Sequence, residues 1–111
     1  MTVTAKNLVP GKTVEASQTT QYTAANVTTI IDKFTATNYS ASSVTISVHL
    51  AVFGDITANK NLVVKNKSLL PSECYTFPEL VGQILNPGNF ISTIASNGSA
   101  ISMRVSGREI T

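Results

Sequence analysis

The sequence predicts an all-β fold, an antiparallel two-sheet β-sandwich of jelly-roll type with one short helix. The clearest observation is alternation along residues 43–53, where every second position is apolar: Val44, Ile46, Val48, Leu50 and Val52. A period of two indicates a strand with one buried face and one wetter face. Turn-forming residues recur about every 8–12 residues, and helices are not regularly interleaved with strands. The 27 Ser and Thr residues and the low share of charged residues, 13%, also favour strands.

The chain length allows one domain with a core that needs no disulfide or metal. We expect residues 1–16 to form an N-terminal arm and residues 17–111 to form a single β-sandwich domain. Within the arm, residues 2–9 are a candidate strand. The turn signal Pro10-Gly11 is expected to end that strand.

Two further strands are expected before the alternating one. Residues 19–23 give a weak strand signal, and residues 27–37 give a stronger signal. Asp32 interrupts the apolar face of the second of these, which favours a strand at a sheet edge over the alternative of a buried carboxylate with satisfied partners. The polar segment 38–42 has the length of a hairpin loop, so it predicts that the strands on either side are antiparallel neighbours.

The period changes after the short strands expected at residues 62–67 and 73–77. Within residues 78–85, apolar residues fall at helical spacing, and Pro78 and Glu79 suit a first helical turn. Asn86-Pro87-Gly88 would stop the helix. We therefore expect about one to two turns of helix covering one end of the sandwich.

The last part of the chain returns to strands. Residues 90–95 and 100–106 are expected as strands, and the second alternates cleanly between apolar and polar residues. Between them, Asn97-Gly98 favours a tight hairpin turn. Residues 107–111 are expected as a tail.

His49 is the one histidine, and it lies on the wetter row of the alternating strand with Thr45, Ser47 and Ala51. A catalytic triad needs a nucleophile, a base and an orienting group that converge in space. Because hydroxyl groups are frequent throughout the chain, Ser47 beside His49 carries little weight. We expect His49 to be a surface or interface residue. The alternative is a catalytic base or a pH-sensitive contact, as in a small hydrolase or glycan-binding module using His49.

No other residues form a recognised catalytic or metal-binding pattern. Cys74 is alone, which excludes an intrachain disulfide and favours a half-buried structural cysteine. Gly11-Lys12-Thr13 lacks the preceding glycine of a phosphate-binding loop. The carboxylates lack the spacing of a calcium loop: Asp55, Glu73 and Glu79. We expect no enzyme activity, no cofactor and no catalytic, cofactor-binding or metal-ligating residues.

Charge and hydropathy limit the classes of partner. The net charge of +2 is small and the basic residues are scattered, so nucleic-acid binding is not expected. Arg104 and Arg108 fit solvated side chains better than a site for an acidic partner. No stretch approaches the roughly 20 apolar residues of a membrane helix, and the first residues lack a signal-peptide run. We expect a protein of cytosolic origin that does not bind membranes.

Three segments in order, residues 44–52, 75–82 and 103–109, carry a resemblance to a known family. Over about residues 19–111, the chain resembles the capsid decoration (cement) proteins of epsilon15-like short-tailed bacteriophages. The resemblance implies a jelly-roll-like protein, made in the host cytoplasm, that binds the major capsid protein on the outer capsid surface of the virion. It also implies homodimers at local two-fold axes that bridge neighbouring capsomers and need no cofactor.

Another phage structural role fits the same residues. A tail, fibre or head–tail joining protein of the same fold class is the alternative. If the protein is a capsid staple, the small, nearly uncharged row from Thr45 to Ala51 is a candidate contact face.

Overall fold

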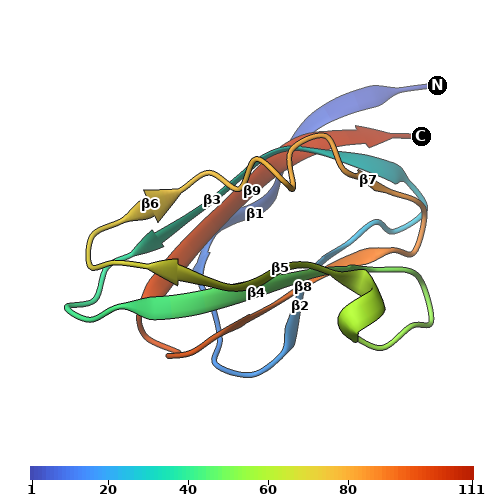
Figure 1. Cartoon of the computed structure of the whole chain (residues 1–111). Helices are drawn as coiled ribbons and strands as arrows, with labels where there is room; N and C mark the ends of the chain where they lie inside the picture. The colour runs from blue at the N-terminus through green and yellow to red at the C-terminus, as the bar shows by residue number, and fades with distance from the viewer.

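This computed structural model describes residues 1–111. Two antiparallel sheets pack face to face in it (Figure 1). Sheet A contains β1 (Val3–Thr13), β9 (Ile101–Ile110), β3 (Thr28–Asn38), β6 (Cys74–Tyr75) and β7 (Ile84–Leu85). Sheet B contains β2 (Thr19–Thr23), β8 (Phe90–Ala95), β4 (Val44–Ala51) and β5 (Leu62–Leu69). One 3₁₀ turn, η1 (Asn59–Asn61), which the sequence did not predict, precedes β5.

The strand order is that of a jelly roll. Sheet A runs β1-β9-β3-β6, with β7 also paired to β3, and sheet B runs β2-β8-β4-β5. The first strands along the chain therefore alternate between the two sheets, and every pairing is antiparallel. The predicted two-sheet antiparallel sandwich is confirmed.

The alternating strand supplies the centre of the core. Val44, Ile46 and Val48 of β4 are buried between the sheets and belong to one continuous cluster of 22 buried apolar residues. Leu50 packs against this cluster and is only partly buried. The row ends there because β4 stops at Ala51, which leaves Val52 exposed.

The hairpins predicted at residues 38–42 and 96–99 are wrong. β3 lies in sheet A and β4 in sheet B, and the same holds for β9 and β8, so each connection crosses between the sheets. Backbone hydrogen bonds instead join each connection to a distant segment. Tyr39 N–H donates to Ala100 O at 2.8 Å, and Ser96 N–H donates to Thr45 O at 2.9 Å. Loop length alone did not reveal that each strand has another partner.

Asn38 fixes the first of these crossings. Its side chain is fully buried, and its Nδ2 donates to the carbonyl oxygens of Ser42 at 2.8 Å and Leu69 at 3.0 Å. Its Oδ1 accepts the backbone N–H of Ser40 at 2.9 Å and the Ser40 hydroxyl at 2.7 Å. The amide therefore ties the end of β3 to the crossing loop and to the end of β5.

We predict that Asn38→Ala destabilises the protein by roughly 3 kcal/mol, because each buried polar group left without a partner costs about 1–3 kcal/mol. Asn97→Ala is the matched control at the other crossing, where the exposed Asn97 Oδ1 accepts one bond from Ser99 N–H at 2.9 Å. We expect this control to cost less than about 1 kcal/mol. Urea unfolding measures both, and equal losses would contradict the role given to Asn38.

The helix predicted at residues 78–85 is also wrong. The segment makes two successive turns, in which Leu80 N–H donates to Phe77 O at 3.0 Å and Gln83 N–H donates to Leu80 O at 3.3 Å. Gly82 then has a φ of +87°, which a right-handed helix does not allow. Its N–H donates to Ile31 O at 2.7 Å, and this bond leads the chain into β7 beside β3.

The helical spacing arose from residues that do not share one face. Leu80 and Leu85 are buried in the core, whereas Val81 and Ile84 are 48% and 58% exposed. Two apolar residues that pack inward from a pair of turns, with two others left on the surface, reproduce the spacing of an amphipathic helix. Hydrogen bonding to β3 therefore holds residues 78–85 as two turns followed by the short strand β7.

The first and last strands are longer than predicted. β1 continues through Pro10-Gly11 to Thr13, with register shifts between Asn7 and Val9 and between Val9 and Lys12. β9 continues to Ile110, so the expected tail is part of sheet A. Residues 3–13 of the expected arm are thus the edge strand of this sheet, and Leu8, Val9 and Val14 belong to the core. The division into an arm and a domain stays a prediction.

Asp32 lies at a bulge in a strand that has partners on both sides. Between Ile31 and Lys33 the register of β3 shifts by one residue against β9, which makes Asp32 the extra residue. On the other side, β6 and β7 pair only with the two ends of β3. The expected edge character is therefore local to the gap between these two short strands.

The molecule measures 46 × 27 × 20 Å along its principal axes. Both termini lie side by side at one end of sheet A (Figure 1), where Thr2 and Thr111 exchange backbone hydrogen bonds of 3.2 and 3.0 Å. The chain contains no helix with the length and apolar character needed to cross a membrane.

Candidate functional site

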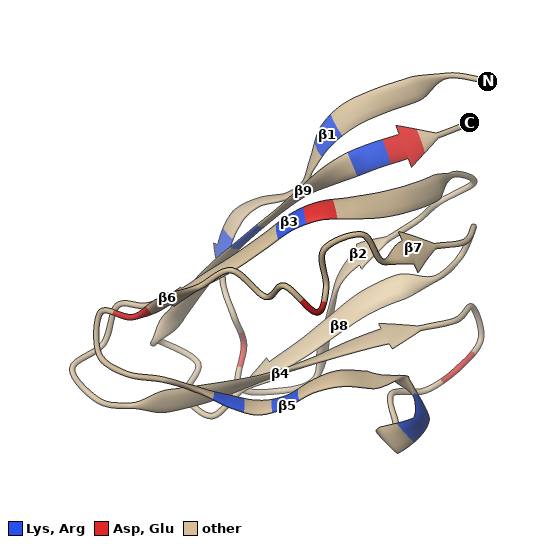
Figure 2. Cartoon of the chain, turned by 45° about the horizontal axis from the view of Figure 1, so that its top comes forward, with Lys and Arg blue, Asp and Glu red and all other residues tan.

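Charged side chains divide unevenly between the two sheets (Figure 2). The three adjacent strands β2, β8 and β4 contain no Lys, Arg, Asp or Glu, and the charges of sheet B are Lys65 and Lys67 in β5. Sheet A carries the larger set: Lys6, Lys12, Asp32, Lys33, Arg104, Arg108 and Glu109. The part of sheet B formed by β2, β8 and β4 is therefore free of charged side chains, whereas β5 and sheet A are not.

The register defines the uncharged surface. Ile46, Val48 and Leu50 face the core, so their neighbours along β4 point away from it. Paired residues lie on the same side of a sheet, which places the following residues on the outside: Thr45, Ser47, His49 and Ala51 of β4, Phe90, Ser92 and Ile94 of β8, and Thr20 and Thr23 of β2. We call this surface the sheet B outer face.

The predicted wetter row of β4 is less exposed than expected. Ser47 is only 7% exposed and His49 only 9%, and Ala51 is buried as well. β4 lies in the interior of sheet B, between β8 and β5, so its short side chains are covered by neighbouring residues on both sides. The outer face is thus closely packed along β4, where Thr45 keeps partial exposure.

Ser47 has a structural role in this face. Its hydroxyl accepts the backbone N–H of Asn66 at 2.8 Å and lies 3.2 Å from Asn66 Oδ1, to which it donates. Asn66 has a φ of +47° at a register shift of β5 against β4. Because the hydroxyl satisfies a backbone group that the sheet ladder leaves free, Ser47 stabilises this bulge.

His49 is held by Gln18 rather than by a catalytic partner. Gln18 Nε2 donates to Ser92 Oγ at 2.8 Å and lies 3.5 Å from His49 Nδ1, which therefore acts as the acceptor. Burial lowers the pKa of His49, because the protonated ring would lose solvation there. His49 makes no hydrogen bond with Ser47 or with a carboxylate, so the pair singled out in the sequence does not form the start of a triad.

The other residues singled out in the sequence are paired with neighbours or lie on the surface. Cys74 is exposed, so the expectation of a half-buried cysteine is wrong. Asp55 pairs with Lys60 at 3.2 Å. Glu73 accepts the Leu70 N–H at 2.7 Å, and Glu79 accepts the Tyr75 hydroxyl at 3.1 Å.

Both arginines of β9 are engaged within sheet A. Arg108 binds both carboxylate oxygens of Asp32, with its closest contact at 2.9 Å from Nη2, and this partner raises the pKa of Arg108. Arg104 donates to Asn7 Oδ1 at 3.2 Å and to Pro10 O at 3.3 Å. No group of three or more His, Cys, Asp or Glu side chains lies close enough together to hold a metal ion.

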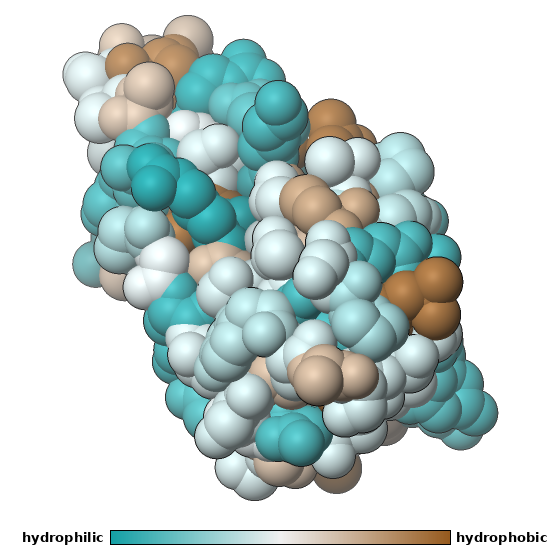
Figure 3. Space-filling model, turned by 90° about the vertical axis from the view of Figure 1, so that its left-hand side faces the viewer, coloured by the Kyte–Doolittle hydropathy of each residue, from teal (hydrophilic) through white to brown (hydrophobic).

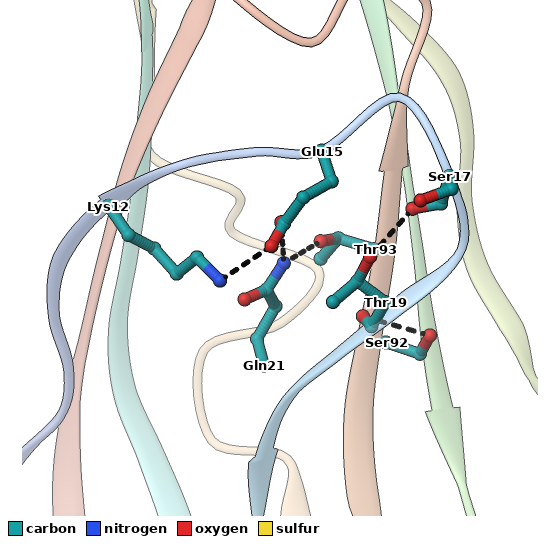
Figure 4. Close-up of polar contacts among 7 residues, drawn as sticks. All are labelled: Lys12, Glu15, Ser17, Thr19, Gln21, Ser92 and Thr93. Atoms are coloured by element: carbon teal, nitrogen blue, oxygen red, sulfur yellow. Dashed lines mark hydrogen bonds and ion pairs between the residues drawn. The ribbon is translucent and has the colours of Figure 1, made fainter.

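A cluster around Glu15 joins the two sheets at one end of the sandwich (Figure 4). Glu15 accepts from Lys12 Nζ at 2.8 Å and from Gln21 Nε2 at 2.9 Å, and Gln21 also donates to Thr93 Oγ1 at 2.9 Å. The hydrogen bond from Lys12, followed by that from Gln21, lowers the pKa of Glu15. Since the cluster links the segment after β1 to β2 and β8, its role is structural.

The surface offers shallow hollows rather than an enclosed site. The largest of them has a volume of about 470 Å³ and lies at the gap beside β3, lined by Asp32, Lys33, Thr76, Pro78 and Val81. The end of the sandwich that carries the loop between β5 and β6 is mainly hydrophilic or weakly polar, with isolated hydrophobic spots (Figure 3). These features favour recognition through flat surfaces over binding of a small molecule.

Comparison with known proteins identifies a shared fold. No protein-family model matches the chain, and no curated protein matches it. A solved structure that does match is a chain from the crystal structure of the T13 IBDV viral particle, an icosahedral virus, with 14% sequence identity and a TM-score of 0.58. The match covers 98% of this chain and 31% of that chain, so this chain spans about a third of the length of the viral one. The β-sandwich is thus a fold that a chain of a virus particle also contains.

Proposed function

We propose that this protein is a non-enzymatic structural protein of a virion that binds the outer capsid surface and bridges neighbouring capsomers. The sheet B outer face carries the proposal, because three adjacent strands lack charge in a chain with eight basic and six acidic residues elsewhere. The shared fold with a chain of an icosahedral virus particle supports the same class of function. The major capsid protein is the proposed partner.

An uncharged, closely packed sheet face suits extensive protein contact for two reasons. Short Ser, Thr and Ala side chains lose little conformational entropy when a partner covers them. Covering this face also removes no ionised group from water, which would be costly without a paired charge. Contacts repeated by the symmetry of a shell then add through multivalency, so each one can be weak.

We predict that Thr20→Glu weakens binding to capsids at least tenfold, equivalent to about 1.4 kcal/mol, because it places a carboxylate on the sheet B outer face. Thr20 is exposed on the edge strand β2, so the change leaves the core intact. Ser102→Glu is the matched control, since Ser102 is an exposed hydroxyl residue on β9 of sheet A. Co-sedimentation with shells lacking this protein measures both affinities.

The same shells test the proposed stabilisation. We expect bound wild-type protein to raise the temperature at which the shells open, and Ser102→Glu to keep this effect. Wild-type protein that does not bind, or that binds without stabilising the shell, would contradict the proposal. A copy number of about twelve or fewer per particle would instead favour a tail or head–tail joining protein, because high copy number is what multivalent binding requires.

A further inference from the structure

The outside of sheet A has a different chemistry from the sheet B outer face. Phe34 of β3 and Met103 of β9 are buried in the core, so their neighbours along each strand point outward. The register then places three cross-strand rows on the outside: Thr13, Ser102 and Thr37; Arg104 and Thr35; and Asn7, Ser106 and Lys33. We call these eight residues the sheet A outer face, and none of them is buried.

Free hydroxyl groups dominate this face. Its eight residues are five Ser or Thr, two cations and one Asn, without a carboxylate or an apolar side chain. Its side-chain hydrogen bonds within the chain are the two that Arg104 donates, so the five hydroxyl groups bond to no other residue. On the sheet B outer face, by contrast, Ser47 bonds to Asn66 and Ser92 to Gln18. The sheet A hydroxyl groups are therefore available to donate to a ligand and to accept from it.

Arg104 and Lys33 add positive charge that no carboxylate neutralises. The four ion pairs of the chain involve other residues, including Lys12 with Glu15 and Arg108 with Asp32 at the borders of this face. Arg104 pairs with Thr35, so Lys33 is its diagonal neighbour, at about 7–8 Å. Two neighbouring cations without an acidic partner favour an anionic ligand.

The guanidinium of Arg104 is held in place before any ligand arrives. Its Nη1 donates to Pro10 O at 3.3 Å and its Nη2 to Asn7 Oδ1 at 3.2 Å. These bonds use two of its five N–H donors and leave three for a ligand. Pro10-Gly11 belongs to the bulge of β1, which lines a shallow groove of about 340 Å³ together with Arg104 and the hydroxyl residues of β3 and β9. A group already fixed in its binding geometry loses less entropy on association.

The composition of this face selects one class of ligand. A protein interface has an apolar centre, and this face has no apolar side chain. Nucleic acids are bound through about 6–10 phosphate contacts or by stacking on aromatic rings, and this face has two cations and no ring. A saccharide fits better, because its hydroxyl groups both donate and accept, as those of Ser and Thr do.

We propose that the sheet A outer face binds an anionic saccharide. Its oxyanion contacts Arg104 and Lys33, and its hydroxyl groups bond to the rows around Thr35 and Ser102. Arg108, the other arginine of β9, takes no part because Asp32 neutralises it. The site goes beyond the proposed function and does not depend on it. In a shell bound through the sheet B outer face, this opposite face of the sandwich would remain uncovered.

Lactose monosulfate, lactose and inorganic sulfate test the ligand class, with binding followed by NMR shifts of the backbone amides. For lactose monosulfate we expect a dissociation constant of about 1 mM or lower, with the shifts centred on residues 10–13, 33–37 and 102–106. We expect lactose and sulfate to bind about tenfold more weakly, because each supplies one of the two kinds of contact. Equal affinity for either of them, or shifts centred on Lys65 and Lys67 of β5, would overturn the proposal.

Charge-removing variants test the site itself. We expect Arg104→Gln to weaken binding of lactose monosulfate by about tenfold and Lys33→Gln by about threefold, because arginine offers directed donors and lysine a point charge. Lys33 makes no bond within the chain, so its replacement leaves the bonds of Arg104 to β1 intact. Lys65→Gln is the matched control, since it removes an exposed, unpaired cation from sheet B.

We expect the Lys65→Gln control to stay within about twofold of the wild-type affinity. An unchanged affinity in Arg104→Gln, or an equal loss in Lys65→Gln, would contradict the site. Wild-type protein that binds shells but not lactose monosulfate would overturn this site alone and leave the capsid proposal intact.

Discussion

Val48→Asp is expected to unfold the protein or to remove most of its stability. Val48 is 0% exposed and lies between the sheets at the centre of the core. A carboxylate there would have no polar partner, and single changes that bury an unpaired charge reach about 4–5 kcal/mol or more. Since a domain of this kind is stable by only about 5–15 kcal/mol, the fraction folded should fall sharply. Circular dichroism during urea and thermal unfolding measures the loss.

Thr45→Asp is the matched control on the same strand. Thr45 lies on the sheet B outer face and is partly exposed, and its bonds to Ser96 involve its backbone N–H and C=O rather than its hydroxyl. A new carboxylate can therefore reach water, and we expect less than half of the loss caused by Val48→Asp. Equal and large losses would mean that both faces of β4 are sealed from solvent.

The second large effect is expected at Gly107 in β9, where any side chain would collide with the backbone of β3. A Cβ at this position would lie 2.2 Å from the carbonyl oxygen of Ile30 and 3.0 Å from Leu8 Cδ1. The register shift at Asp32 occurs where Ile31 pairs with Gly107. We expect Gly107→Ala to cost about 3 kcal/mol or more, at or above the upper end for overpacking, because the colliding atom belongs to the backbone.

Gly98→Ala separates this steric effect from the general effect of replacing a glycine. A Cβ at residue 98 would lie 3.5 Å from Ala16 N and 3.6 Å from Ala16 Cβ, which are ordinary contacts. We expect this variant to stay within about 1 kcal/mol of the wild type, with a small gain allowed by the reduced freedom of the unfolded chain. Guanidinium unfolding of both variants measures the two changes in the free energy of unfolding. A tolerated Gly107→Ala would show that β3 and β9 can separate locally.

Local patterns predicted the strands but not their partners. The alternation along β4 and β9 identified which of their residues face the core, because a strand side chain alternates between two faces whatever its neighbours are. The loops at residues 38–42 and 96–99 had hairpin lengths and hairpin residues, yet each connects two sheets. Asn38 shows why, since its side chain bonds to the loop residues Ser40 and Ser42 and also to Leu69 O, 31 residues away, which no local signal connects to it.

The candidate site was predictable only in part. The sequence shows that residues 19–23, 43–53 and 90–95 contain no Lys, Arg, Asp or Glu, and it placed His49 on the row facing away from the core. It gave no sign that Gln18 would contact His49 and Ser92, or that Ser47 would bind Asn66, because these partners come from other strands and loops.

The sequence by itself determined an all-β chain, the residues of its core strands and its low charge. Each of these follows from the period and chemistry of neighbouring residues. Only the tertiary structure decided that β2, β8 and β4 lie side by side as one uncharged surface, that residues 78–85 bend into turns beside β3, and that β1 is an edge strand of sheet A. Backbone hydrogen bonds between distant segments fix these arrangements. The sequence does not reveal them, because the backbone groups that form these bonds are the same from residue to residue and carry no sequence signal.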